Sequence, residues 1–180
     1  MPITIKSERE IELMTEAGRI LGIVHKELEK ALKPGMSTLD IDALGEEVIR
    51  SYGCEPSFLN YNGYPASICV SVNDEIVHGI PSAKHLIKEG DIVSLDAGVI
   101  YKGYHSDSAY TYIIGKVDKD TERLVNETRR ALYEGIKVVK AGIKLNDVCS
   151  AIGKVAKENG FGVFECLTGH GVGRNLHEDP

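Results

Sequence analysis

The chain has 180 residues and a formal net charge of −6, which is long enough for one domain with a substantial core. It has no apolar run near the roughly 20 residues that cross a bilayer, no apolar signal-peptide stretch and no cluster of Lys or Arg. We therefore expect a globular cytoplasmic protein that binds neither nucleic acid nor membranes directly. Its 4 cysteines form no CxxC pair, which favours free, mostly buried thiols.

The N-terminal part of the chain predicts two helices. Over residues 8–32, apolar side chains recur at steps of three and four after a capping-box sequence that starts at Ser7. Lys-Pro-Gly at 33–35 ends this helix. A second helix is expected to follow Ser37 and to end at Gly53.

The middle of the chain predicts strands. Residues 66–80 and 91–114 are rich in Val, Ile and Tyr. The pair at 73–74 (Asn-Asp) breaks the first segment, and the Lys-Gly pair at 102–103 divides the second into a hairpin. The elements expected after it are helices over 122–139 and 146–159 and a short strand near 161–164.

The two helical regions resemble each other when the sequence is shifted by 107 residues. The matching pairs are Lys33 and Lys140, Gly35 and Gly142, Asp40 and Asp147, Val48 and Val155, and Gly53 and Gly160. We interpret this as an internal duplication within a single domain, 1–180. The first α/β half would cover about 1–118, the second about 119–180 would be incomplete, and the two would share a site.

Two aspartates interrupt the predicted hairpin, although strands usually avoid Asp. A two-residue turn places Asp96 opposite Ala109 and Asp107 opposite Gly98, so the two carboxylates share one face with backbones about 7 Å apart. Such a pair repels unless a proton or a cation lies between its members. We hypothesise that both are metal ligands. A solvated hairpin face is the alternative that these residues alone leave open.

Three histidines lie in glycine-containing segments. His170 and His177 belong to GHGVGRNLHED, and His78 belongs to EIVHGIP. Neutral imidazole is a common ligand for transition metals, although each histidine alone is also compatible with a structural role. No phosphate-binding glycine motif, no G-x-S-x-G and no H-E-x-x-H is present, which excludes those site types.

Taken together, the D-x10-D spacing, HGIP and GHGVGRNLHE resemble the type I methionine aminopeptidases, of the pita-bread fold shared with aminopeptidase P, prolidase and creatinase. IKSEREIELMTEAGRI, LKPGMSTLDID and PSFLNYNGYPASICVSVNDEIVHGIP extend the match over nearly the whole chain. The resemblance implies an α+β fold of two pseudo-symmetric halves. It also implies an enzyme that removes the N-terminal methionine from nascent proteins with a small second residue.

The resemblance also implies two divalent metal ions (Co, Mn, Fe or Zn) whose bridging hydroxide attacks the scissile carbonyl. Asp96 would bind one ion, Asp107 both and His170 the second. His177 would contact the substrate carbonyl, and His78 would contact the substrate backbone. The expected wall of the methionine pocket consists of Phe58, Tyr61, Tyr64 and Cys69. Leu176 stands where relatives often have an aromatic residue.

Two further glutamate ligands expected from the resemblance have no match before Pro180, since neither Glu165 nor Glu178 stands at a matching position. The 180 residues alone are therefore expected to bind the ions weakly. An X-Pro aminopeptidase of the same fold and a non-catalytic binding module remain alternatives. The expected partner is the N-terminus of new polypeptides and the expected full-length state is a monomer. The sequence leaves ribosome association open.

Overall fold

A computed structural model describes residues 3–180, which form two compact units: one runs up to Lys116 and includes Gly169–Pro180, and the other is Val117–Thr168. The first unit contains α1 (Glu8–Ala31), α2 (Thr38–Ser51), β1 (Glu55–Pro56), the short 3-10 helix η1 (Tyr61–Gly63), β2 (Ile68–Val72), β3 (Ile92–Tyr101) and β4 (Tyr104–Ile113). The second contains α3 (Lys119–Val138) and α4 (Leu145–Glu158). The division falls close to the predicted boundary at 118, whereas residues 169–180, expected in the second half, lie with the first unit.

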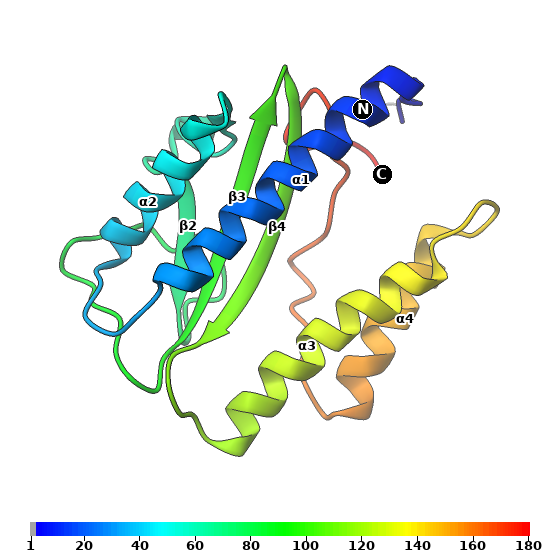
Figure 1. Cartoon of the computed structure of the whole chain (residues 1–180). Helices are drawn as coiled ribbons and strands as arrows, with labels where there is room; N and C mark the ends of the chain where they lie inside the picture. The colour runs from blue at the N-terminus through cyan, green and yellow to red at the C-terminus, as the bar shows by residue number, and fades with distance from the viewer. Residues whose placement is uncertain (1–2) are drawn as a thin grey trace. The chain divides into compact units, whose positions relative to one another are not determined.

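The helices begin and end close to the predicted positions. Both helices of the first unit start with a capping box, in which Ser7 pairs with Glu10 and Ser37 pairs with Asp40. Each box satisfies backbone N–H groups that the first helical turn leaves without partners. The buried stripe of α1 packs onto the sheet, and Figure 1 shows this helix lying across β3 and β4.

The sheet is antiparallel and centred on β3. β4 pairs with one edge of β3, while β2 and the short β1 pair with the other edge. The predicted hairpin register is confirmed: Asp96 lies opposite Ala109, and Asp107 lies opposite Gly98. Alternate residues of β3 are fully buried in the core beneath α1, namely Val93, Leu95, Ala97 and Val99. Asp96 therefore points to the other face.

A buried carboxylate joins α2 to the start of β2. Asp42 is 8% exposed, and its Oδ1 accepts hydrogen bonds from the backbone N–H groups of Ser67 and Ile68, both at 2.9 Å. Burial raises the pKa of Asp42, so the site needs the oxygen acceptor more than the charge.

We expect Asp42→Ala to lower the free energy of unfolding by about 2–4 kcal/mol, because it leaves two buried N–H groups without an acceptor. Asp42→Asn retains the Oδ1 acceptor and is expected to remain close to wild type. Urea denaturation measures both variants. Equal losses for the two would show that the carboxylate charge, and not the pair of hydrogen bonds, is what stabilises this junction.

Several predicted elements need correction. The predicted break at Asn73-Asp74 is confirmed, since β2 ends at Val72 and Asn73 has φ +55°, but residues 75–80 after the break form a loop and not a second strand. The strand near 161–164 is wrong: this segment is irregular and exposed, and it pairs with no strand among residues 3–180. A strand needs a neighbour to satisfy its backbone groups. Cys54 and Cys69 are buried, but Cys149 and Cys166 are exposed; all are free.

The second unit repeats the local structure of α1 and α2. Its two helices are joined through Gly142 (φ +89°), as α1 and α2 are joined through Gly35 (φ +90°). Asp147 caps the start of α4 at the position that corresponds to Asp40. These matches agree with the 107-residue shift. No helix among residues 3–180 has the length and apolar character needed to cross a membrane.

Candidate metal and substrate site

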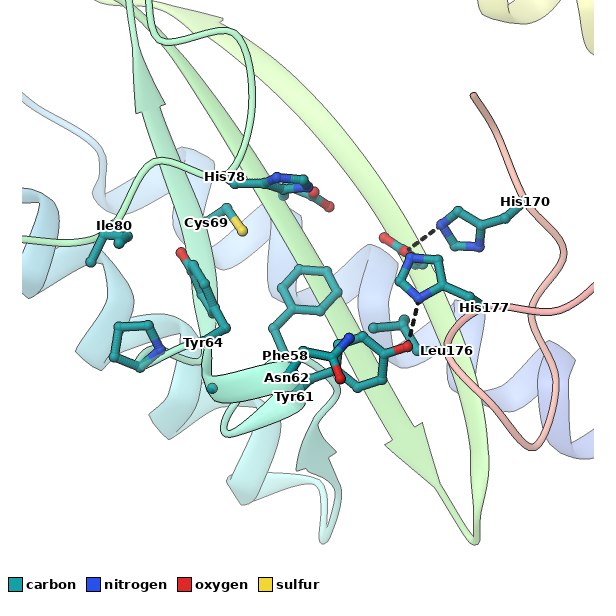
Figure 2. A pocket seen from close by; sticks show the side chains of 14 residues that line it. Phe58, Tyr61, Asn62, Tyr64, Cys69, His78, Ile80, His170, Leu176 and His177 are labelled. Atoms are coloured by element: carbon teal, nitrogen blue, oxygen red, sulfur yellow. Dashed lines mark hydrogen bonds and ion pairs between the residues drawn. The ribbon is translucent and has the colours of Figure 1, made fainter. Parts of the chain in front are cut away.

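A pocket of about 520 Å³ lies on the face of the hairpin opposite α1, within the first unit. It is lined by all nine residues singled out from the sequence: Phe58, Tyr61, Tyr64, Cys69, His78, Asp96, Asp107, His170 and His177. Figure 2 shows the labelled side chains arriving from the η1 turn, β2, the loop that follows β2, and the C-terminal segment. Further lining residues that sequence reasoning did not assign to the pocket are Asn62, Gly63, Pro65, Ile80 and Leu176.

Asp96 and Asp107 lie close enough in the pocket for each carboxyl group to change the pKa of the other. Burial, the charge of Asp107 and a hydrogen bond to Asp107 raise the pKa of Asp96 to about 7. Burial also raises the pKa of Asp107, while its hydrogen bond with Asp96 acts in the opposite direction. Two partly buried carboxylates this close need a proton or a cation between them, so the pair has the chemistry of a cation site.

The orientation of His170 extends this site. Its Nδ1 lies 2.9 Å from the carbonyl oxygen of Gly171. Since a carbonyl can only accept, Nδ1 carries the proton, and in the neutral ring Nε2 presents a lone pair. That Nε2 lies 3.5 Å from Oδ2 of Asp107, as the dashed line in Figure 2 marks. Two electron-rich atoms facing each other fit a proton or metal ion between them.

The three predicted metal ligands lie near one another in pairs, with Asp107 next to both Asp96 and His170. Among residues 3–180, no group of three His, Cys, Asp or Glu side chains has the arrangement of a metal site. Asp107 is the common member, since it meets Asp96 on one side and His170 on the other. This position agrees with the bridging role expected for Asp107, while the roles themselves stay predictions.

His177 lies between His170 and Tyr61. Its ring centroid is 4.1 Å from that of His170, and its Nδ1 is 2.8 Å from the hydroxyl of Tyr61. Burial, followed by the nearby His170 charge, lowers the pKa of His177, which favours the neutral ring. If the Tyr61 hydroxyl donates to Nδ1, Nε2 of His177 bears the hydrogen and can donate to a substrate.

The other side of the pocket is apolar. Phe58, Cys69 and Leu176 form a buried cluster against which Tyr64 packs. Burial raises the pKa of the Cys69 thiol to about 11. The thiol is therefore neutral near pH 7, and it lines the pocket as an apolar group and does not act as a nucleophile. Aromatic rings and a thiol suit a thioether side chain. Leu176 completes this wall.

His78 is held at the pocket by a constrained loop. Its backbone has φ +59°, a conformation unusual outside glycine. The next residue, Gly79, accepts hydrogen bonds through its carbonyl from Val70 N at 3.0 Å and Tyr64 Oη at 2.9 Å, and its N–H donates to Ser71 Oγ at 3.0 Å. Sequence reasoning missed Ser71, since only the fold brings it beneath this loop.

The carboxylate pair predicts a pH dependence for the metal-free protein. The folded-state pKa of Asp96 is raised to about 7, above the ordinary value near 4. The folded protein therefore binds this proton more tightly than the unfolded chain, and the resulting stabilisation is complete below about pH 4. This stabilisation is lost as the pH rises through 7. With chelator present, we expect the melting temperature of the wild type to fall as the pH rises through 7. In Asp96→Asn, the part of this fall that comes from ionisation of Asp96 should be absent. An unchanged pH profile in Asp96→Asn would contradict the pairing.

The comparisons with known proteins agree with this site. The model of metallopeptidase family M24 matches residues 12–180. Methionine aminopeptidase 1 of Bacillus subtilis (strain 168) is 46% identical over 178 residues, 99% of this chain and 71% of the relative. The crystal structure of methionine aminopeptidase from Thermotoga maritima superposes with a TM-score of 0.97 at 43% identity, covering 99% of this chain and 72% of that one.

A more distant match extends the likeness to proline-specific peptidases. The Xaa-Pro dipeptidase of Bacillus anthracis has a TM-score of 0.86 at 30% identity, and the match covers 98% of this chain and 48% of that one. These likenesses confirm the predicted α+β pita-bread fold class, and they support a divalent metal as cofactor. The family match covers more than half of the chain and includes every residue of the pocket, so the protein belongs to metallopeptidase family M24.

Proposed function

We propose that the protein is a metal-dependent aminopeptidase that releases the N-terminal methionine from polypeptides whose second residue is small. The observation that carries this proposal is the partly buried pair Asp96 and Asp107, which lines the same pocket as His170, His177 and an apolar wall. The relatives with the names quoted above support the choice of methionine over other first residues.

Asp96, Asp107 and His170 would hold two divalent ions, with Asp107 shared between them. Such ions act as Lewis acids and lower the pKa of a water toward neutrality. Carboxylate and imidazole ligands accept Mn, Fe, Co and Zn, so availability would decide which metal is used. The resemblance assigns two further carboxylate ligands to these ions.

The protein's other residues would bind and orient the substrate. Phe58, Tyr64, Cys69 and Leu176 would enclose the methionine side chain. His78 would contact the substrate backbone. The Nε2–H of His177, fixed by Tyr61, would donate to the scissile carbonyl oxygen as negative charge develops there, a contribution of about 3–4 kcal/mol for such donors.

The partner that fits this site is the N-terminus of a newly made polypeptide, in the cytoplasm. Ribosome association and the expected monomeric state are separate proposals that this site does not decide. An apolar pocket next to Asp96 and Asp107 favours a free N-terminal residue with a long apolar side chain.

The proposal is tested by peptide turnover. Full-length protein with Mn²⁺ or Co²⁺ is expected to release methionine from Met-Ala-Ser and to leave an Ala-Pro peptide uncut. Turnover of Ala-Pro with no release of methionine would favour the X-Pro aminopeptidase reading. Absence of both activities, together with no retained metal, would favour a non-catalytic binding module.

A further inference from the structure

The segment that carries His170 and His177 has little regular structure of its own. A single bridge closes it, formed by Gly171 N to Glu178 O at 2.8 Å and Glu178 N to Gly171 O at 2.9 Å. His170 precedes this bridge, and His177 lies just inside it. The placement of both rings therefore depends on what holds the closed loop 171–178 in shape.

The carboxylate of Glu178 fills the inside of this loop. Its Oε1 accepts a hydrogen bond from the backbone N–H of Asn175 at 3.1 Å. Its two oxygens press against Gly173 so closely that a Cβ there would lie 2.6 Å from each of them. Glu178 is not among the residues that line the pocket, and its carboxylate oxygens are bound by Asn175 N and Lys6 Nζ.

A cation from the other end of the chain meets this carboxylate. Lys6 Nζ lies 2.5 Å from Oε2 of Glu178, with side chains only 18% and 11% exposed. Thr4 Oγ1 lies 3.4 Å from the same oxygen and 2.6 Å from Lys6 Nζ. A largely buried carboxylate needs such a partner, and a shielded ion pair couples its members more strongly than an exposed one.

We propose that Lys6 and Glu178 are a positioning pair that fixes the loop bearing His170 and His177 for catalysis. The proposal rests on the proposed function of the pocket and assigns no direct contact with the substrate to either residue. Glu178 shapes the loop from within, and Lys6 neutralises its charge. A second ion pair also joins this loop to the N-terminal region, between Arg174 and Glu10 at 3.4 Å. It contributes less, because the Arg174 side chain is 67% exposed.

The test uses full-length enzyme loaded with Mn²⁺ and the Met-Ala-Ser peptide. Lys6→Met and Glu178→Gln are each expected to lower kcat about 10- to 100-fold, because small misplacements of a reacting group have effects of this size. KM is expected to change less than threefold, since neither residue touches the pocket. The double variant should be no slower than the slower single variant. Lys6→Arg should restore most of the activity.

The matched control is Lys30→Met. Lys30, in the last turn of α1, forms an ion pair with Glu27 at 2.7 Å, but its side chain is 69% exposed. This variant is expected to keep wild-type kcat and KM. Wild-type kcat in Lys6→Met, or effects of Lys6→Met and Glu178→Gln that simply multiply in the double variant, would overturn the proposed pairing.

A second measurement separates this inference from the function itself. Ring-nitrogen NMR of the histidines reports the His177 Nδ1 hydrogen bond to Tyr61 without any turnover. In folded Lys6→Met protein, the His177 ring signals are expected to shift or broaden, while those of His25, on the α1 side of the sheet, stay unchanged. Unmoved His170 and His177 signals would overturn the inference even if the peptide is cleaved. If the signals shift in a protein that cleaves no peptide, the positioning role is supported and only the proposed activity is contradicted.

Discussion

Replacement of Asp107 by alanine is expected to abolish release of methionine from Met-Ala-Ser, with kcat/KM falling by at least about 10³-fold, because the shared ligand supplies several kcal/mol of charge stabilisation. Asp107 is the one carboxylate that meets both Asp96 and His170. Without the Asp107 carboxylate, Asp96 and His170 would no longer have a ligand in common. Steady-state kinetics at saturating metal measures the effect. If the substitution only weakened metal binding, excess metal would fill the site again and restore turnover.

The matched control for this prediction is Ser94→Ala. Ser94 lies on the same face of β3, two residues before Asp96. The distance between its hydroxyl and that of Thr111 is 2.7 Å, and neither residue lines the pocket. This variant should keep turnover within about threefold of wild type, since a lone surface-type hydrogen bond contributes about 1 kcal/mol to stability. Retained turnover in Asp107→Ala would refute the bridging role.

Gly79→Ala is expected to have the second-largest effect. A Cβ at this position would lie 2.3 Å from the carbonyl oxygen of Val70 and 2.8 Å from Cα of Ser71. Both are backbone atoms of β2, so the loop must move away from the strand. Such overpacking costs about 1–3 kcal/mol in unfolding free energy. The displacement would also carry His78 out of the pocket, and kcat/KM should fall about 10²-fold.

Gly18→Ala is the control for this substitution. Gly18 lies within α1, and a Cβ there would meet no atom within 4 Å. It should stabilise the protein by about 0.5–1 kcal/mol, as expected for alanine in a helix interior. Melting curves and peptide turnover of the two variants give the comparison. If Gly79→Ala matched Gly18→Ala in both, the close packing of the His78 loop on β2 would not matter for the site.

The hairpin shows why part of the site could be predicted from sequence. A two-residue turn fixes its register, and the register alone sets Asp96 and Asp107 on one face. The buried stripe of α1 and the capping boxes at Ser7 and Ser37 follow from local rules that need no partner. Motif resemblance then supplied the histidines, whose approach to Asp107 no local pattern indicates.

Other features depend on contacts that no local pattern encodes. The segment 161–164 has the composition of a strand, yet it has no neighbour to pair with among the described residues. Ser71 supports the loop that carries His78, and Leu176 completes the apolar wall, only through contacts between segments far apart in the sequence. Lys6 and Glu178, 172 positions apart, meet for the same reason. Pairings of this range require the tertiary structure.

Metal titration tests the central claim most directly. Full-length wild-type protein and the double variant Asp96→Asn/Asp107→Asn would each be stripped with chelator, checked for folding by circular dichroism and titrated calorimetrically with Mn²⁺. The account predicts saturable binding by the wild type and loss of that binding in a double variant that remains folded. Binding of equal affinity and stoichiometry by both proteins would contradict it.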